Sequence, residues 1–170
     1  MTTAPALPEA DALIRRLAEE IAGHLTPQSA VVGIHTGGAW VAQKLLTLLG
    51  AEIPLGTLDI AFYRDDFSRM GLHPQVRPSS IDFPVEGAHI ILVDDVLYTG
   101  RTVRAAMNEL FDFGRPASIE LAVLIDRGGR ELPICAQYVG AVLPLPPHQH
   151  IQLARDPHGR LSLTLLDKRH

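Results

Sequence analysis

Several residue types are scarce in this chain of 170 residues. Its only cysteine is Cys135, which excludes an internal disulfide and fits a reducing compartment. Aromatic residues make up 5%, so a core has to be built from Val, Leu, Ile and Ala, as in sheets covered by helices on both faces. The formal net charge of -4 argues against a general nucleic-acid-binding surface and leaves a local basic patch open.

Long apolar runs are also missing. None approaches the roughly 20 residues needed to span a bilayer, and the N-terminus lacks the apolar segment of a signal peptide. We therefore expect one cytoplasmic domain over residues 1–170 without membrane contact, preceded by a loose leader at 1–8. Four C-terminal histidines lack acidic or cysteine partners at zinc-like spacing, which predicts a surface loop and no metal site: His148, His150, His158 and His170.

Strand-like and helix-like segments alternate along most of the chain, which favours an α/β fold with a mainly parallel sheet. Helices are expected at 9–25, 39–49 and 102–113, and strands at 30–34, 55–63, 89–93, 118–125, 137–143, 152–153 and 161–166. The proline-rich, charged stretch 64–84 predicts a flexible arm. Because ligands bind beyond the carboxyl ends of parallel strands, chemistry is expected in the loops after Ile34, Val93 and Ile125.

One loop combines several features of a sugar-phosphate site. An apolar strand runs into Asp94 and Asp95, and a small polar turn and a helix follow. Adjacent carboxylates suit the cis diol of a ribose and can help to hold hydrated Mg²⁺. The turn 99–102 places backbone N–H groups and hydroxyls at a helix N-terminus, where a phosphate binds. The alternative is an ordinary strand and helix joined by an acidic, solvated tip, but the ordered combination favours the site.

This block resembles the motif with which type I phosphoribosyltransferases bind phosphoribosyl pyrophosphate (PRPP). It is most similar to that of the PyrR family, whose members regulate pyrimidine operons and are also uracil phosphoribosyltransferases. Further support comes from segments 32–38, 58–66, 103–107, 114–119 and 121–134. The resemblance implies a type I phosphoribosyltransferase fold, a parallel sheet flanked by helices with a protruding arm. It also implies Mg²⁺-dependent conversion of uracil and PRPP to UMP and pyrophosphate.

The resemblance also implies roles for individual residues. Catalysis falls to Asp94, Asp95 and Arg127, and the same two aspartates hold Mg²⁺ through water. The 5′-phosphate is bound by Tyr98, Thr99, Gly100, Arg101 and Thr102, and the pyrophosphate by Thr36, Gly37 and Gly38. The base lies against Val96, Asp126 and Arg127, and Arg64, Asp65, Asp66 and Arg69 belong to an arm that closes over PRPP. The plain alternatives are a tight turn at 36–38, a structural Asp126–Arg127 pair and a charged, exposed loop at 64–69.

Some positions depart from the family pattern. Gly37 stands where an arginine is usual, so the pyrophosphate loop lacks one cation and the rate is expected to be modest. Tyr98 stands where many purine-directed relatives carry an aspartate, which disfavours a purine substrate. Trp40 begins the helix after the pyrophosphate loop and is expected to pack against neighbouring residues or to lie at an interface.

Several other departures fall where RNA-binding members carry polar or basic groups, so binding of mRNA is expected to be weak or absent. They are Glu19, Glu20, Gly23, Gly129 and Ala141. Three functions stay open: a uracil phosphoribosyltransferase, a regulator that senses UMP or PRPP with weak or no catalysis, and a phosphoribosyltransferase for another base. A homodimer or homotetramer is expected from the family.

Overall fold

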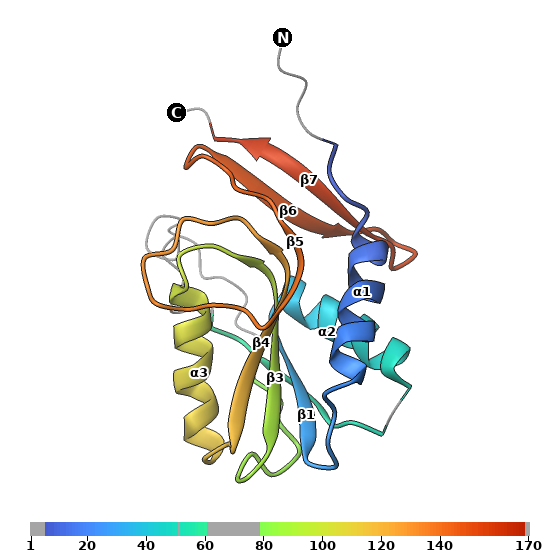
Figure 1. Ribbon diagram of the computed structural model, residues 1–170, viewed down its shortest axis with the longest axis vertical. Coiled ribbons are helices and arrows are strands. Elements are labelled where there is room, and N and C mark those ends of the chain that lie inside the picture. The colour runs from blue at the N-terminus through green and yellow to red at the C-terminus, as the bar shows by residue number, and fades with distance from the viewer. Residues whose placement is uncertain (1–5, 51, 61–78, 169–170) are drawn as a thin grey trace.

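A parallel sheet with helices on both faces forms the body of the molecule (Figure 1). The computed structural model describes residues 6–50, 52–60 and 79–168. Its elements are α1 (Ala10–Ala22), β1 (Ser29–Ile34), α2 (Gly37–Leu49), β2 (Leu55–Leu58), β3 (His89–Leu97), α3 (Arg101–Phe113), β4 (Ser118–Asp126), β5 (Tyr138–Val142), β6 (Gln149–Arg155) and β7 (Leu161–Asp167). The sheet has the order β2-β1-β3-β4-β5, and β6 pairs with β7 in a separate antiparallel hairpin. The predicted α/β fold is confirmed.

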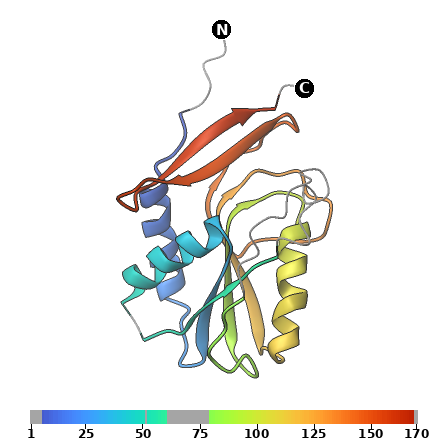
Figure 2. The same ribbon diagram turned by 180° about the vertical axis from the view of Figure 1, so that it is seen from behind.

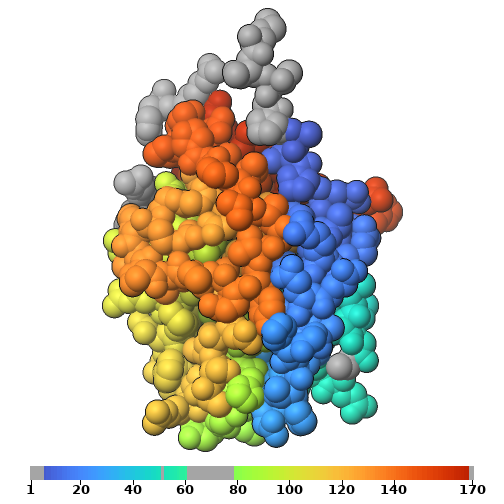
Figure 3. Space-filling view, in the orientation of Figure 1, coloured from blue at the N-terminus to red at the C-terminus, as the bar shows by residue number. Residues whose placement is uncertain are grey.

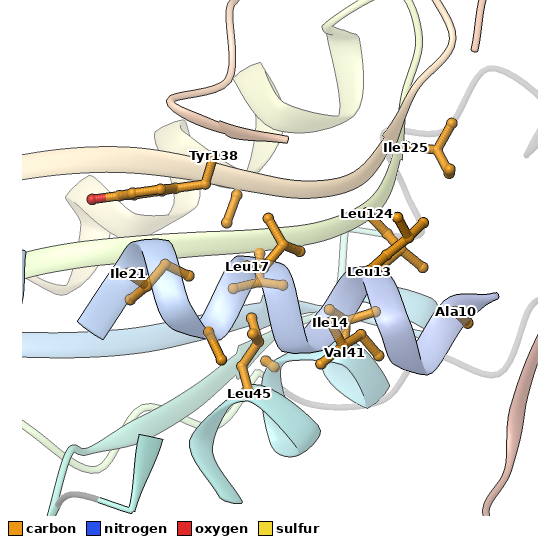
Figure 4. Packing of buried hydrophobic residues seen from close by; sticks show 14 of the residues in the cluster. Ala10, Leu13, Ile14, Leu17, Ile21, Val41, Leu45, Leu124, Ile125 and Tyr138 are labelled. Carbon is orange, nitrogen blue, oxygen red and sulfur yellow. The ribbon is translucent and has the colours of Figure 1, made fainter. Parts of the chain in front are cut away.

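The low aromatic content is matched by a core of aliphatic side chains in two clusters. Successive side chains of a strand point to opposite faces, so Ile91 and Val93 pack beneath α1 and α2 while Leu92 packs beneath α3. Figure 2 shows the sheet from the side of α2. In Figure 4 the apolar stripe of α1 packs against both the sheet and the neighbouring helix α2, with Leu17 close to Leu45. Each fully buried aliphatic side chain of this kind contributes about 1.5–3 kcal/mol.

The hairpin of β6 and β7, which we call the hood, lies across the carboxyl end of the sheet (Figures 1 and 2). It is fixed there by Ile151, Leu153 and Leu161, which are buried in the same cluster as α1. Because ligands of parallel sheets bind at the carboxyl ends of the strands, the hood roofs the end where a site is expected. None of the helices in the described ranges is long and apolar enough to cross a membrane.

Several element boundaries differ from those expected, including those of β2, β3 and α2. The strand expected at 55–63 ends at Leu58, and residues 61–63 lie outside the described ranges. The strand expected to stop at Val93 continues to Leu97, because its pairing with β4 continues to the Leu97–Asp126 pair. The second helix begins at Gly37, so the glycine pair forms its first turn. Because β3 extends to Leu97, Asp94 and Asp95 lie within a hydrogen-bonded strand.

Candidate active site

The acidic pair occupies the carboxyl end of β3, next to β4. Asp94 is 5% exposed and lies opposite Val123 in the sheet, while Asp95 is half-buried. The Oδ1 atom of Asp94 accepts a hydrogen bond from the backbone N–H of Asp95 at 2.8 Å. The Oδ1 atom of Asp95 accepts one from the backbone N–H of Val96 at the same distance. Both carboxylates are thus held by their own backbone. A solvated acidic tip does not describe this arrangement, because Asp94 is buried.

The predicted pyrophosphate loop lies directly against these acids, and glycine makes this approach possible. A Cβ at Gly38 would be 2.5 Å from the Val93 carbonyl oxygen and 3.0 Å from the Asp94 Cα. A Cβ at Gly37 would overlap the Asp95 carboxylate. Thr36 is the N-cap of α2, and the first N–H groups of a helix have no partner within it. An anion at this helix N-terminus would therefore lie beside the two aspartates.

The turn after β3 has the backbone geometry of a phosphate-binding turn. Gly100 has φ of 95°, a left-handed conformation that favours glycine, and it is the N-cap of α3. The hydroxyl of Thr99 accepts the Arg101 N–H at 3.2 Å. The Arg101 side chain instead lies outward, with its Nε 3.6 Å from Glu131. The backbone N–H and the guanidinium of Arg101 thus both have partners within the protein.

The loop that follows β4 braces this turn from outside. The Thr99 carbonyl accepts the N–H groups of Glu131 and Leu132 at 2.9 and 3.0 Å, and Arg130 donates to the Tyr98 carbonyl at 2.6 Å. In Figure 3 the orange segment after β4 covers the green region between β3 and α3. A second N–H group of Arg130 donates to Asp126 at 2.6 Å. The turn is therefore held by backbone contacts from a neighbouring loop, which gives its N–H groups a fixed direction.

Asp126 and Arg127, predicted to contact the base, have clear partners within the protein. Burial alone would raise the pKa of Asp126, but hydrogen bonds from Arg130 and the Gly128 N–H, with the Arg130 charge, lower it. The ion pair of Asp126 is thus with Arg130, and the structural Asp126–Arg127 pair considered as an alternative is not formed. Arg127 is 2% exposed, and burial lowers its pKa. Its contact with a base stays a prediction.

One cavity of about 570 Å³ joins these parts, a size typical of sites for small organic ligands. Its wall contains residues from the α2 N-terminus, the end of β3, the turn after β3 and the hood: Thr36, Gly37, Trp40, Asp94, Asp95, Val96, Tyr98, Thr99, Thr102, His150, Ile151, Gln152, Leu153 and Lys168. The cavity thus brings together most of the residues predicted to bind PRPP. Gly38, Gly100 and Arg101 belong to the same two helix N-termini but do not line it.

Sequence reasoning missed the hood's contribution to this cavity. His150 was expected in a surface loop, but it lies in β6 and lines the cavity together with Lys168. Burial, followed by the charges of Lys168 and Arg127, lowers the pKa of His150. Trp40, expected to pack or to lie at an interface, also lines the cavity and has the Arg155 guanidinium 4.7 Å from its ring centroid. The alternation of polar and apolar residues at 150–153 was the available signal for a half-buried strand.

Most of the predicted arm lies outside the described ranges. This holds for all four residues expected to close over PRPP: Arg64, Asp65, Asp66 and Arg69. At the described end of that stretch, Ser80 pairs with Thr57 through two backbone hydrogen bonds of 2.9 Å. The closing role of the arm stays a prediction.

The expected Mg²⁺ can be tested against the ligands present. Among the described residues no cluster of three or more His, Cys, Asp or Glu side chains is placed to hold a metal ion. Mg²⁺ is usually bound by one or two carboxylates together with water and substrate phosphates. Asp94 and Asp95 fit that mode, and they do not form a site for a tightly held structural metal.

Comparisons with known proteins agree with this geometry. A family model described as "Phosphoribosyl transferase domain" matches residues 6–155. A "Bifunctional protein PyrR" of Pseudomonas fluorescens is 54% identical, with 92% of this chain and 96% of that protein covered. The protein of the same name from Nitrosococcus oceani is 53% identical, with 92% of each chain covered.

Among solved structures, a hypoxanthine-guanine phosphoribosyltransferase from Bacillus anthracis has a TM-score of 0.66 at 20% identity, covering 85% of this chain and 86% of that chain. A likeness at this identity shows the shared fold. The family matches confirm the predicted family and enzyme class, and the chain belongs to the PyrR family of phosphoribosyltransferases.

Proposed function

We propose that the cavity binds PRPP and uracil and that the chain converts them to UMP and pyrophosphate. The observation that carries this proposal is the meeting of two helix N-termini and two aspartates around one cavity. Helix N-termini attract phosphate groups, and carboxylates accept hydrogen bonds from sugar hydroxyls. PRPP carries two phosphate-containing groups on one ribose, so it matches this arrangement.

Each part of PRPP has an assigned place. The ribose hydroxyls donate hydrogen bonds to Asp94 and Asp95. The 5′-phosphate accepts hydrogen bonds from backbone N–H groups of the turn 99–102. The pyrophosphate lies at the N-terminus of α2, where Thr36 offers a hydroxyl and the two glycines offer N–H groups. Val96 and Tyr98 form one wall of the base site, and the hood forms the other. This placement orients the reactants before any bond changes.

In the reaction, N1 of uracil forms a bond to C1 of the ribose while the bond from C1 to the pyrophosphate oxygen breaks. The N1 proton passes to the leaving pyrophosphate, and positive charge develops on the sugar ring. The carboxylates of Asp94 and Asp95 lie at the ribose, where they stabilise that charge. Asp94 and Asp95 would help to hold Mg²⁺, which would neutralise the charge of the leaving pyrophosphate. The hood excludes water that would otherwise hydrolyse PRPP.

Gly37 is expected to limit the rate, and Tyr98 is expected to set the choice of base. The carboxylate of Asp95 occupies the space that a side chain at position 37 would need, so the loop offers backbone N–H groups and no cation there. A modest rate is expected for that reason. Tyr98 presents no carboxylate to a purine ring, whereas uracil has an acidic N–H and needs less help from a base.

A panel of bases assayed with PRPP and Mg²⁺ tests this function. Turnover with uracil and none with hypoxanthine, guanine or adenine is expected. Turnover with a purine alone would contradict the choice of base, and no turnover with any base would contradict the enzyme activity.

A second candidate is a regulator that senses UMP or PRPP, because the relatives are named bifunctional. Two observations weigh against RNA as its target. Glu19 and Glu20 are exposed on α1, and a Cβ at Gly129 would be 2.5 Å from the Tyr98 ring, so a larger side chain does not fit there. We infer that RNA affinity is low. Filter binding of pyrimidine-leader RNA with UMP tests this, and tight, salt-sensitive binding would contradict it.

The family resemblance favours a homodimer or homotetramer, which light scattering after size-exclusion chromatography measures directly. A monomer at all concentrations would contradict that assignment.

A further inference from the structure

A single buried arginine joins the hood to the turn that follows β3. Arg127 extends from the end of β4, and its two terminal nitrogens donate to the carbonyls of Gln149 at 2.7 Å and Pro146 at 3.1 Å. The centre of its guanidinium lies 3.8 Å from the Tyr98 ring centroid. One side chain therefore contacts the first residue of β6 and the residue directly before the phosphate turn 99–102 at the same time.

We propose that Arg127 is a positioning residue that keeps the base side and the phosphate side of the cavity in register. It does so by binding the hood through hydrogen bonds and Tyr98 through the face of its guanidinium. This inference rests on the proposed function, because the two sides are named for the parts of PRPP and uracil that they bind. It differs from the base contact expected from the sequence.

Arginine is suited to this task for geometric reasons. Its planar guanidinium donates along its edges and stacks through its face, so one group satisfies two carbonyls and one ring. A lysine ammonium has the charge but no plane, and cannot make all three contacts in these directions. Removing the side chain leaves two carbonyls without their donors at the base of the hood.

The Tyr98 ring is confined from a second direction as well. Gly129 approaches the ring edge so closely that a Cβ there would be 2.5 Å from a ring carbon, and Arg130 holds the Tyr98 carbonyl. The ring is thus contacted at its edge by Gly129 and on its face by Arg127. A shift of the Arg127 side chain would release the ring and the turn 99–102 that follows it.

The exposure of Arg127 separates the two possible roles. It is 2% exposed and is not among the residues that line the cavity, whereas Tyr98 and His150 are. A residue in direct contact with the base should affect ligands that carry a base and spare those that do not. A positioning residue should affect both kinds, because it holds the phosphate turn.

Ligand affinity without catalysis is measurable through Trp40, the only tryptophan of the chain, which lines the cavity. We would titrate UMP and ribose 5-phosphate into the wild-type protein and into Arg127→Met, Arg127→Lys and Tyr98→Leu, following tryptophan fluorescence. Arg160→Met is the matched control, because Arg160 is an exposed arginine next to β7 in the same hairpin. Thermal unfolding of each variant shows whether it is folded.

Arg127→Met and Arg127→Lys are expected to lose at least about tenfold in affinity for both ligands, and Arg160→Met to lose none. Tyr98→Leu should weaken binding of ribose 5-phosphate similarly. Its combination with Arg127→Met should have less than the summed effect, because both changes break the same contact between the guanidinium and the ring. If an Arg127 variant does not fold, Tyr98→Leu still tests the contact from its other side.

Three results would overturn this inference. They are weaker binding of UMP with unchanged binding of ribose 5-phosphate, wild-type affinity in folded Arg127 variants, and fully additive effects of the two substitutions. Failure of the wild-type protein to bind either ligand would instead contradict the proposed function, and this inference with it.

Discussion

Replacing Gly38 by alanine tests the close approach of α2 to the acid-bearing strand. The added Cβ would be 2.5 Å from the Val93 carbonyl oxygen, whereas ordinary van der Waals contacts begin at 3.4 Å. The helix N-terminus and β3 must therefore separate by about 0.9 Å, a displacement that in other enzymes costs on the order of a hundredfold in rate. Overpacking of this kind also lowers the free energy of unfolding by about 1–3 kcal/mol.

The assay is kcat/KM for PRPP with saturating uracil, together with urea unfolding. Gly50→Ala is the matched control, because Gly50 caps the other end of α2 with φ of 60°, and a Cβ there would have no heavy atom within 4 Å. That substitution should cost about 1–2 kcal/mol of stability through its left-handed backbone and leave kcat/KM unchanged. A folded Gly38→Ala protein with wild-type kcat/KM would refute the reasoning.

Three further predictions concern titratable side chains. Asp94→Asn and Asp95→Asn should each lower kcat/KM for PRPP by about a hundredfold or more, since they remove charge at the sugar. Both should keep the melting temperature within a few degrees, because an amide oxygen still accepts the N–H bonded at 2.8 Å; normal activity would contradict the assigned role. Burial, with the charge of Glu120, raises the pKa of Tyr138 to about 12. The unfolded chain loses that proton first, so stability should fall as the pH rises from 10 toward 12. Urea unfolding of Tyr138→Phe should show a smaller fall, and an equal fall would count against the assignment. The pKa of His150 is lowered in the folded chain. As the pH falls below 6.5, the unfolded chain therefore binds a proton at this histidine before the folded chain does, and the free energy of unfolding decreases. His150→Gln should be less sensitive to acid, and an unchanged pH profile of unfolding would exclude this contribution.

The sequence predicted those parts of the site that are local in the chain. The acid pair and the phosphate turn lie within one short segment, so the strand, the carboxylates and the helix start are read together. The apolar stripe of α1 likewise predicts its own burial, as Leu13 and Leu17 show. The helix end was misplaced by three residues because Gly23 stops a pattern that continues to Leu25.

Contacts between distant segments were beyond sequence reasoning. His150 reaches the cavity only because the hood folds back over β3, and no local pattern states where a hairpin will lie. The partners of Arg127 are backbone carbonyls about twenty residues away, which any sequence could offer. The cis peptide bond between His35 and Thr36 could not be predicted from the sequence either, because cis bonds are expected almost only before proline.

A crystal structure with UMP and Mg²⁺ tests most directly whether β3 and the turn after it bind a sugar phosphate. The ribose hydroxyls should lie at Asp94 and Asp95, with the phosphate at the N–H groups of residues 99–102. UMP bound elsewhere on the molecule, or this cavity found empty at a saturating concentration of UMP, would contradict the assignment.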